Sequence, residues 1–136
     1  MAQSYFEEKV YWYIEHNIRV LFSGRRERFC YDFIKEMETV EESTSKCDHL
    51  TLVICIDYGG RDEIIRAITA GAKTEEQITI ELTKMAPCPD VILRTGGEYR
   101  LSNFMLWQAA YAELFFIKDF FPELTGKKLD TILTEY

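Results

Sequence analysis

Two arginines, a serine and a pair of glycines lie close together in the sequence and could bind an anion. Arg94 and Arg100 flank Gly96 and Gly97, and Ser102 follows two residues later. Arginine binds phosphate oxygens through two N–H groups at once, and glycine readily adopts the positive φ angles of a tight turn. Such a turn could direct two guanidinium groups, a hydroxyl and backbone N–H groups towards one point. The spacing therefore predicts a binding site for a polyanionic group such as a diphosphate.

The segments on either side of this turn indicate how it is held. Residues 90–93 are typical of a short buried strand, and residues 103–112 form an apolar run that predicts a helix buried on every side. Ser102 and Asn103 are residue types that cap helices, so we expect them to begin this helix. Because a helix N-terminus favours negative charge, this placement agrees with a phosphate site.

The remaining elements alternate between helices and strands. Hydrophobic periodicity and turn residues predict helices over 4–15, 29–43, 61–70, 74–85 and 128–134, and strands over 18–22, 50–56 and 114–117. The strand at 50–56 is almost entirely apolar, which is typical of a strand buried on both faces. The order predicts an α/β fold, with a mainly parallel sheet of about four strands and flanking helices, in a single domain over residues 1–136.

Two further strand ends carry residues that could reach a ligand at the same rim of a parallel sheet. Arg26 follows the strand at 18–22, and Gly60 and Arg61 follow the strand at 50–56. Ligands of such sheets bind at the carboxyl ends of the strands, so all three are possible contacts for a diphosphate. The simpler interpretation of Arg26 is a solvated loop, and that of Gly60 is a structural turn.

Composition narrows the classes of partner. The net charge of -7 argues against general nucleic-acid binding, which depends on an excess of Lys and Arg. The four cysteines include no CxxC pair and fit a reducing, cytoplasmic location rather than a zinc site. The most apolar stretch, residues 104–117, is too short and too polar to be a transmembrane segment, and the N-terminus does not resemble a secretory signal.

The run Arg94-Thr95-Gly96-Gly97-Glu98-Tyr99-Arg100-Leu101-Ser102-Asn103-Phe104, continued by Leu106-Trp107-Gln108 and Tyr111-Ala112-Glu113, resembles the cis-prenyltransferases, the undecaprenyl diphosphate synthase family. The resemblance implies that Arg94, Arg100 and Ser102 bind the diphosphate of isopentenyl diphosphate. It also implies that Glu113 helps to bind Mg²⁺. Members of that family join isopentenyl units to an allylic diphosphate with a Z double bond.

The sequence also departs from that family. Its members carry an Asp-Gly-Asn-Gly-Arg-Trp motif that holds Mg²⁺ and the allylic diphosphate, and these 136 residues contain none. The segment Asp57-Tyr58-Gly59-Gly60-Arg61 is only faintly similar and corresponds to a later, Asn-Tyr-Gly-Gly-Arg segment. The resemblance therefore covers roughly the second half of a usual member, a partial undecaprenyl diphosphate synthase-like fold.

These departures lead to an expectation about partners. We expect one subunit of a heteromeric enzyme, with no catalytic residue of its own and no activity alone. A second polypeptide would supply the catalytic aspartate and the allylic site. Two alternatives stay open, a non-catalytic scaffold or ligand-sensing subunit of a complete synthase and a fragment of an ordinary homodimeric enzyme. Peripheral attachment to a membrane is also left open.

Overall fold

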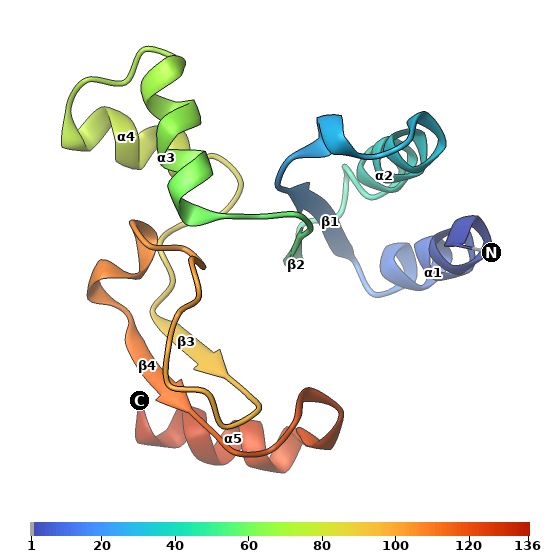
Figure 1. Cartoon of the computed structure of the whole chain (residues 1–136). Helices are drawn as coiled ribbons and strands as arrows, with labels where there is room; N and C mark the ends of the chain where they lie inside the picture. The colour runs from blue at the N-terminus through green and yellow to red at the C-terminus, as the bar shows by residue number, and fades with distance from the viewer. Residues whose placement is uncertain (1) are drawn as a thin grey trace. The chain divides into compact units, whose positions relative to one another are not determined.

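Four strands form two hydrogen-bonded parallel pairs, β1 with β2 and β3 with β4 (Figure 1). The computed structural model describes the backbone of residues 2–136 and the side chains of residues 9–136. It divides into two compact units, residues 1–59 and 60–136, with one strand pair in each. The predicted α/β class with parallel strands and flanking helices is confirmed, but the strands pair two by two rather than in one ladder of four.

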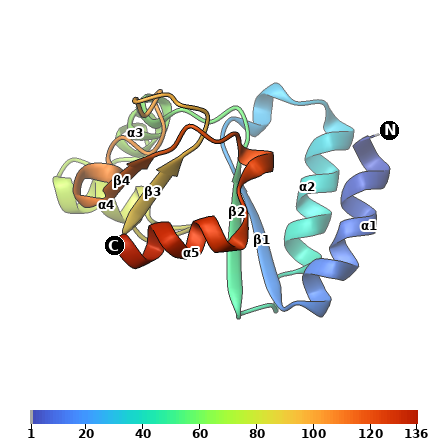
Figure 2. The same cartoon turned by 90° about the horizontal axis from the view of Figure 1, so that it is seen from below.

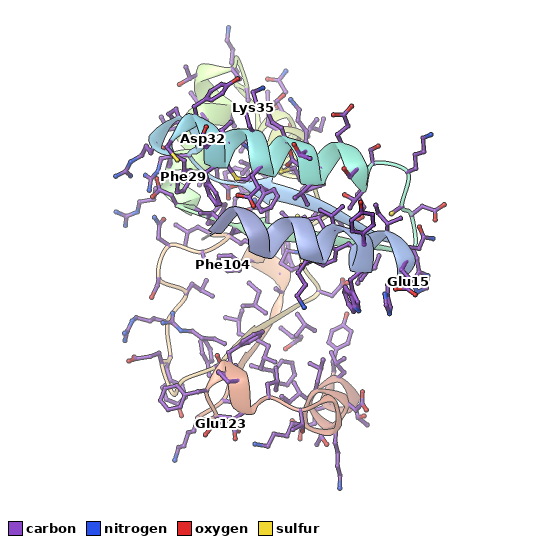
Figure 3. All side chains as sticks on the ribbon, turned by 90° about the vertical axis from the view of Figure 1, so that its right-hand side faces the viewer. Glu15, Phe29, Asp32, Lys35, Phe104 and Glu123 are labelled. Atoms are coloured by element: carbon purple, nitrogen blue, oxygen red, sulfur yellow. The ribbon has the colours of Figure 1, made fainter. Side chains whose placement is uncertain are left out.

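The first unit consists of two helices and two strands. Its elements are α1 (Ala2–Glu15), β1 (Ile18–Ser23), the 3-10 turn η1 (Arg26–Arg28), α2 (Tyr31–Ser43) and β2 (Leu50–Cys55). The helices lie side by side against the strands (Figure 2). Figure 3 shows the same pair from another side, with Glu15 at the end of α1 and Asp32 and Lys35 near the start of α2.

The core of this unit joins β1 to α2. Val20 and Phe22, alternate residues of β1, are buried against Met37 and Val40, which lie three residues apart on α2. Alternate strand residues share a face, and residues three apart share a helix face, so the two patterns match. This is why the strand at 18–22 and the helix at 29–43 are predicted correctly from the sequence.

The strand β2 is less covered than its composition predicts. Leu50 is 54% exposed and Leu52 is 38% exposed, so the prediction of a strand buried on both faces is wrong. Both α1 and α2 contact β1 within this unit. Leu50 and Leu52 therefore have little cover from the helices of their own unit, whereas Ile54 packs against the core.

The second unit holds the predicted anion site. Its elements are α3 (Gly60–Thr69), α4 (Glu75–Leu82), β3 (Val91–Arg94), the 3-10 turns η2 (Gln108–Tyr111) and η3 (Phe121–Glu123), β4 (Glu113–Phe116) and α5 (Gly126–Glu135). β3 and β4 pair in parallel from Val91 opposite Glu113 to Arg94 opposite Phe116. Among residues 2–136 we find no helix with the length and hydrophobicity needed to cross a bilayer.

The predicted helix over 103–112 is wrong. Ser102, Asn103 and Met105 have φ angles of 49°, 65° and 45°, which belong to the left-handed region and cannot form an α-helix. Regular structure is limited to the short turn η2, and Tyr111 is 99% exposed rather than buried. The segment is instead held by hydrogen bonds to residues that precede it by more than 40 positions.

Candidate functional site

Arg94 lies at the carboxyl end of β3 and closes the turn that follows it. Its Nη1 atom donates a hydrogen bond to Ser102 Oγ at 2.8 Å and another to the backbone oxygen of Arg100. The Arg94 side chain is therefore bonded to the Ser102 hydroxyl and to the Arg100 backbone, and the binding role of these three residues stays a prediction. Within the described residues, the Arg94 side chain donates hydrogen bonds only through Nη1, whereas a guanidinium group has five N–H donors.

Gly96 and Gly97 give the turn its shape. Their φ angles are 89° and 74°, which glycine adopts without a steric penalty. Their N–H groups donate to Asp119 and Ile117 backbone oxygens, each at 2.8 Å. The expectation that these N–H groups point at a ligand is corrected, because they attach the turn to the segment that follows β4.

Arg100 is the more exposed cation of the site. Its guanidinium group forms an ion pair with Glu98, and the two side chains are 62% and 47% exposed. The residue between them, Tyr99, packs its ring 5.6 Å from the ring of Phe116. An anion that binds Arg100 must therefore compete with a carboxylate from the same turn.

An apolar pocket adjoins Arg94. It has a volume of about 350 Å³ and is lined by Ile92, Leu93, Arg94, Thr95, Leu101 and Phe104. Small-molecule sites usually have volumes of roughly 300–1,000 Å³, so this pocket suits a small group. A cation beside an apolar pocket can accept a ligand that has a charged head and a short hydrocarbon tail.

Asn103 connects this turn to the start of α3. The N–H of Gly60 donates to the Asn103 backbone oxygen at 2.7 Å, and the N–H of Arg61 donates to Asn103 Oδ1 at 3.0 Å. A Cβ atom on Gly60 would lie 3.0 Å from Leu106 Cγ, so glycine allows this close approach. Gly60 and the Arg61 backbone therefore have structural partners.

Sequence reasoning identified Asn103 as a cap but assigned it to the wrong helix. It caps α3, which begins 43 residues earlier, rather than a helix that follows it. The available signal was the residue type, because asparagine tolerates positive φ angles and has a side-chain acceptor. The sequence does not show which helix lies within reach of that acceptor.

Arg26 belongs to the first unit and has structural partners there. It donates to both carboxylate oxygens of Glu41, at 2.9 Å for Oε2, and to the backbone oxygen of Phe22 at 2.8 Å. The hydrogen bonds that Arg26 donates to the Glu41 carboxylate raise the pKa of Arg26. These contacts favour a structural role for Arg26 over its predicted contact with a diphosphate.

Asp57 is also engaged within the first unit. Arg25 donates to its two carboxylate oxygens at 3.1 and 2.6 Å, and Arg28 lies 3.1 Å from one of them. The hydrogen bond from Arg25 is the main cause that lowers the pKa of Asp57. The faint similarity of this segment to a metal-binding motif thus corresponds to an arginine–carboxylate cluster.

Glu113 lies at the other end of the β3–β4 ladder. It is paired with Val91, whereas Arg94 is paired with Phe116, three residues further along. At about 3.3 Å per residue, the two ends are separated by about 10 Å. In the part of the chain that the structure describes, no group of three or more His, Cys, Asp or Glu residues could hold a metal ion. The described residues alone therefore do not provide the oxygen ligands that Mg²⁺ prefers, and the metal role of Glu113 stays a prediction.

The fold and the turn define a class of protein. The chain is an α/β protein in which a parallel strand ends at a turn with two arginines and a serine, next to an apolar pocket. This arrangement is typical of a site for a phosphorylated ligand at the carboxyl end of a strand.

Comparisons with known proteins identify the family. The family model for undecaprenyl diphosphate synthase matches residues 1–136. An isoprenyl transferase of Wolinella succinogenes is 39% identical over 142 residues, which cover 100% of this chain and 62% of that protein. The chain therefore belongs to the undecaprenyl diphosphate synthase family of cis-prenyltransferases.

Solved structures agree with this assignment. A probable undecaprenyl diphosphate synthase from Campylobacter jejuni is similar with a TM-score of 0.87 and 35% identity, over 96% of this chain and 64% of that one. Lavandulyl diphosphate synthase from Lavandula x intermedia shares the fold, with a TM-score of 0.86 and 24% identity over 98% of this chain. The chain spans less than two thirds of the length of each of these proteins.

Proposed function

We propose that this chain binds isopentenyl diphosphate and serves as one subunit of a heteromeric cis-prenyltransferase. The observation that carries the proposal is that Arg94 lines the pocket and also donates hydrogen bonds to Ser102 Oγ and to the backbone oxygen of Arg100. The partner would supply the catalytic aspartate, further Mg²⁺ ligands to act with Glu113, and the site of the allylic diphosphate. We expect a cytoplasmic location for this complex.

Each residue of the site has a task that its chemistry suits. The two guanidinium groups would neutralise most of the charge of a diphosphate, and an arginine–phosphate hydrogen bond is strong because both partners are charged. Ser102 Oγ accepts a hydrogen bond from Arg94, which leaves the hydroxyl proton for a phosphate oxygen. The pocket beside Leu101 and Phe104 would hold the isopentenyl group. When bound in the complete complex, Mg²⁺ would assist the departure of the allylic diphosphate.

Binding can be measured on the full chain by calorimetry with isopentenyl diphosphate. We expect Arg94→Ala to weaken binding at least tenfold, because a hydrogen bond to a charged group contributes about 1.5–3 kcal/mol. Lys84→Ala removes a cation that pairs with Glu81 on the surface of the same unit and should leave affinity unchanged. Equal affinities for the two variants would argue against the proposed site.

The catalytic role is tested by reconstitution. We expect no prenyl transfer by the chain alone with Mg²⁺, and transfer after addition of a polypeptide that carries the Asp-Gly-Asn-Gly-Arg half. Turnover by the isolated chain would contradict the heteromeric proposal. Loss of activity in an intact complex containing Arg94→Ala would support substrate binding in catalysis.

A scaffold or ligand-sensing subunit is the second candidate. It is favoured by the internal partners of the site, since Arg94 bonds to Ser102 and Arg100 pairs with Glu98. If the complex with Arg94→Ala remains fully active, this second function is supported instead.

A further inference from the structure

We infer that Asn103 is a positioning residue for the diphosphate site, a role that rests on the proposed function. Asn103 does not have to touch the ligand in this role. It would act by fixing the backbone that presents Ser102, its neighbour in sequence. Three contacts and one conformational feature support the inference.

The first observation is the backbone conformation. Ser102 and Asn103 are consecutive residues with φ angles of 49° and 65°. Residues other than glycine adopt such angles at an energetic cost and keep them only where the surrounding structure imposes them. Ser102 Oγ therefore occupies its position only if neighbouring contacts hold this pair.

Part of that constraint is local, because the N–H of Phe104 donates to the Leu101 backbone oxygen at 3.0 Å and closes the turn around the pair. Contacts on both sides of the pair add to it. On one side, Arg94 Nη1 donates to Ser102 Oγ at 2.8 Å. On the other side, Asn103 accepts the first N–H groups of α3, from Gly60 at 2.7 Å and from Arg61 at 3.0 Å. A diphosphate would compete for the donors of Arg94, whereas the Asn103 contacts are independent of the ligand. Asn103 is therefore the residue that attaches the Ser102 end of the turn to α3 when Arg94 binds phosphate, while Gly96 and Gly97 attach the other end to the segment after β4.

The start of α3 is a suitable anchor because it is itself fixed. Gly60 is buried, and a Cβ atom there would lie 3.0 Å from both the Leu106 backbone N and its Cγ atom. The helix start and the segment 103–106 are thus in direct contact. The Asn103 side chain adds a hydrogen bond to a surface where the backbones already meet.

Two substitutions separate the side-chain contact from the backbone conformation. Asn103→Ala removes the Oδ1 acceptor of the Arg61 N–H and introduces a residue that disfavours a positive φ angle. Asn103→Gly also removes the acceptor but tolerates the angle. The backbone contact between Gly60 and residue 103 is available in both variants. If the side-chain contact positions the turn, both variants should bind isopentenyl diphosphate more weakly, by about tenfold for Ala and by about threefold or more for Gly.

A matched control excludes a general loss of stability. Thr74 caps α4 in the same unit by accepting the N–H of Gln77 at 3.3 Å, so Thr74→Ala removes a comparable cap away from the turn. We expect Thr74→Ala to lower the melting temperature as Asn103→Gly does while leaving the dissociation constant unchanged. Dissociation constants are measured by calorimetry on the full chain, well below the melting temperatures of all variants.

The outcomes are distinguishable from failure of the proposed function. If Arg94→Ala abolishes binding but Asn103→Gly binds as the wild type does, the positioning role is overturned and the site stands. If Asn103→Gly and Thr74→Ala weaken binding equally, Asn103 acts only through stability and the inference is also overturned. If Arg94→Ala has no effect, the proposed site itself fails.

Discussion

At the scale of single residues, the site contains its own competing anion. Glu98 pairs with Arg100 in the turn, and both side chains are largely exposed. Exposed ion pairs contribute about 0.2–1 kcal/mol, so the competition should be measurable but modest. Glu98 would thus lower the affinity for a diphosphate while keeping Arg100 oriented within the turn.

The prediction for Glu98 is a gain of affinity. We expect Glu98→Gln to tighten the binding of isopentenyl diphosphate about two- to fivefold, because Arg100 no longer has to leave a carboxylate. Glu81→Gln is the control, since it removes the same charge from another surface pair, with Lys84, in the same unit. Calorimetry on both variants checks the prediction. Weaker binding by Glu98→Gln would show that Glu98 orients Arg100 rather than competing with the ligand.

At the scale of elements, side chains bind the backbone groups of β1 along the edge of the strand that does not pair with β2. The N–H of Val20 donates to Thr44 Oγ1 at 3.0 Å, and the N–H of Phe22 donates to Glu41 Oε1 at 2.9 Å. Arg26 donates to the Phe22 backbone oxygen and to Glu41. An open strand edge favours association with other strands, and these contacts satisfy its backbone groups instead.

Removal of the Thr44 hydroxyl should therefore destabilise the first unit. Thr44 is fully buried, so Thr44→Val leaves the buried N–H of Val20 without its acceptor, at a cost of about 1–3 kcal/mol. Thr39→Val in α2, the helix that Thr44 follows, is the control, because the exposed Thr39 hydroxyl donates to the Lys35 backbone oxygen. Urea unfolding measures both variants. A loss of stability no larger than that of Thr39→Val would contradict the edge-closing role.

The correct and incorrect predictions differ in how far apart in the sequence the contacting residues lie. The strand at 18–22 and the helix at 29–43 follow from periodicities of two and of three to four residues, which depend on local neighbours. Residues 103–112 have an equally apolar pattern, but the contacts of Asn103 with Gly60 and Arg61 bridge more than 40 residues. Local patterns cannot reveal such contacts, and here those contacts determine the backbone.

The candidate site shows the same distinction. Residue type and spacing indicated that Arg94 and Ser102 lie close together, because both belong to one segment of nine residues. They did not show that the Gly96 N–H would be used by the segment after β4. Glu113 lies close to the turn in sequence, but parallel pairing puts it at the opposite end of the ladder.

At the scale of the whole molecule, each unit contains an aspartate whose pKa is lowered by an arginine or lysine partner. In the first unit, the hydrogen bond from Arg25 is the main cause that lowers the pKa of Asp57 from its usual 3.8. In the second unit, the hydrogen bond from Lys128 similarly lowers the pKa of Asp119. A carboxyl group whose pKa is lower in the folded chain than in the unfolded chain contributes stability to the fold at pH values above its pKa in the unfolded chain. That contribution is lost as the pH falls through the folded value.

We therefore expect Asp57 and Asp119 each to contribute to a loss of stability of its unit below about pH 3.8. Asp57→Asn should be less stable than the wild type at pH 6, and the difference should shrink towards zero as the pH falls to about 2. Asparagine tolerates the φ angle of 46° at this position, so the substitution mainly removes charge. Asp119→Asn should behave in the same way in the second unit.

Amide hydrogen exchange measured from pH 6 down to pH 2 reports the two units separately, because protected amides are assigned residue by residue. A difference for Asp57→Asn that persists unchanged at pH 2 would show that the Arg25 contact stabilises the fold through its geometry rather than through its charge.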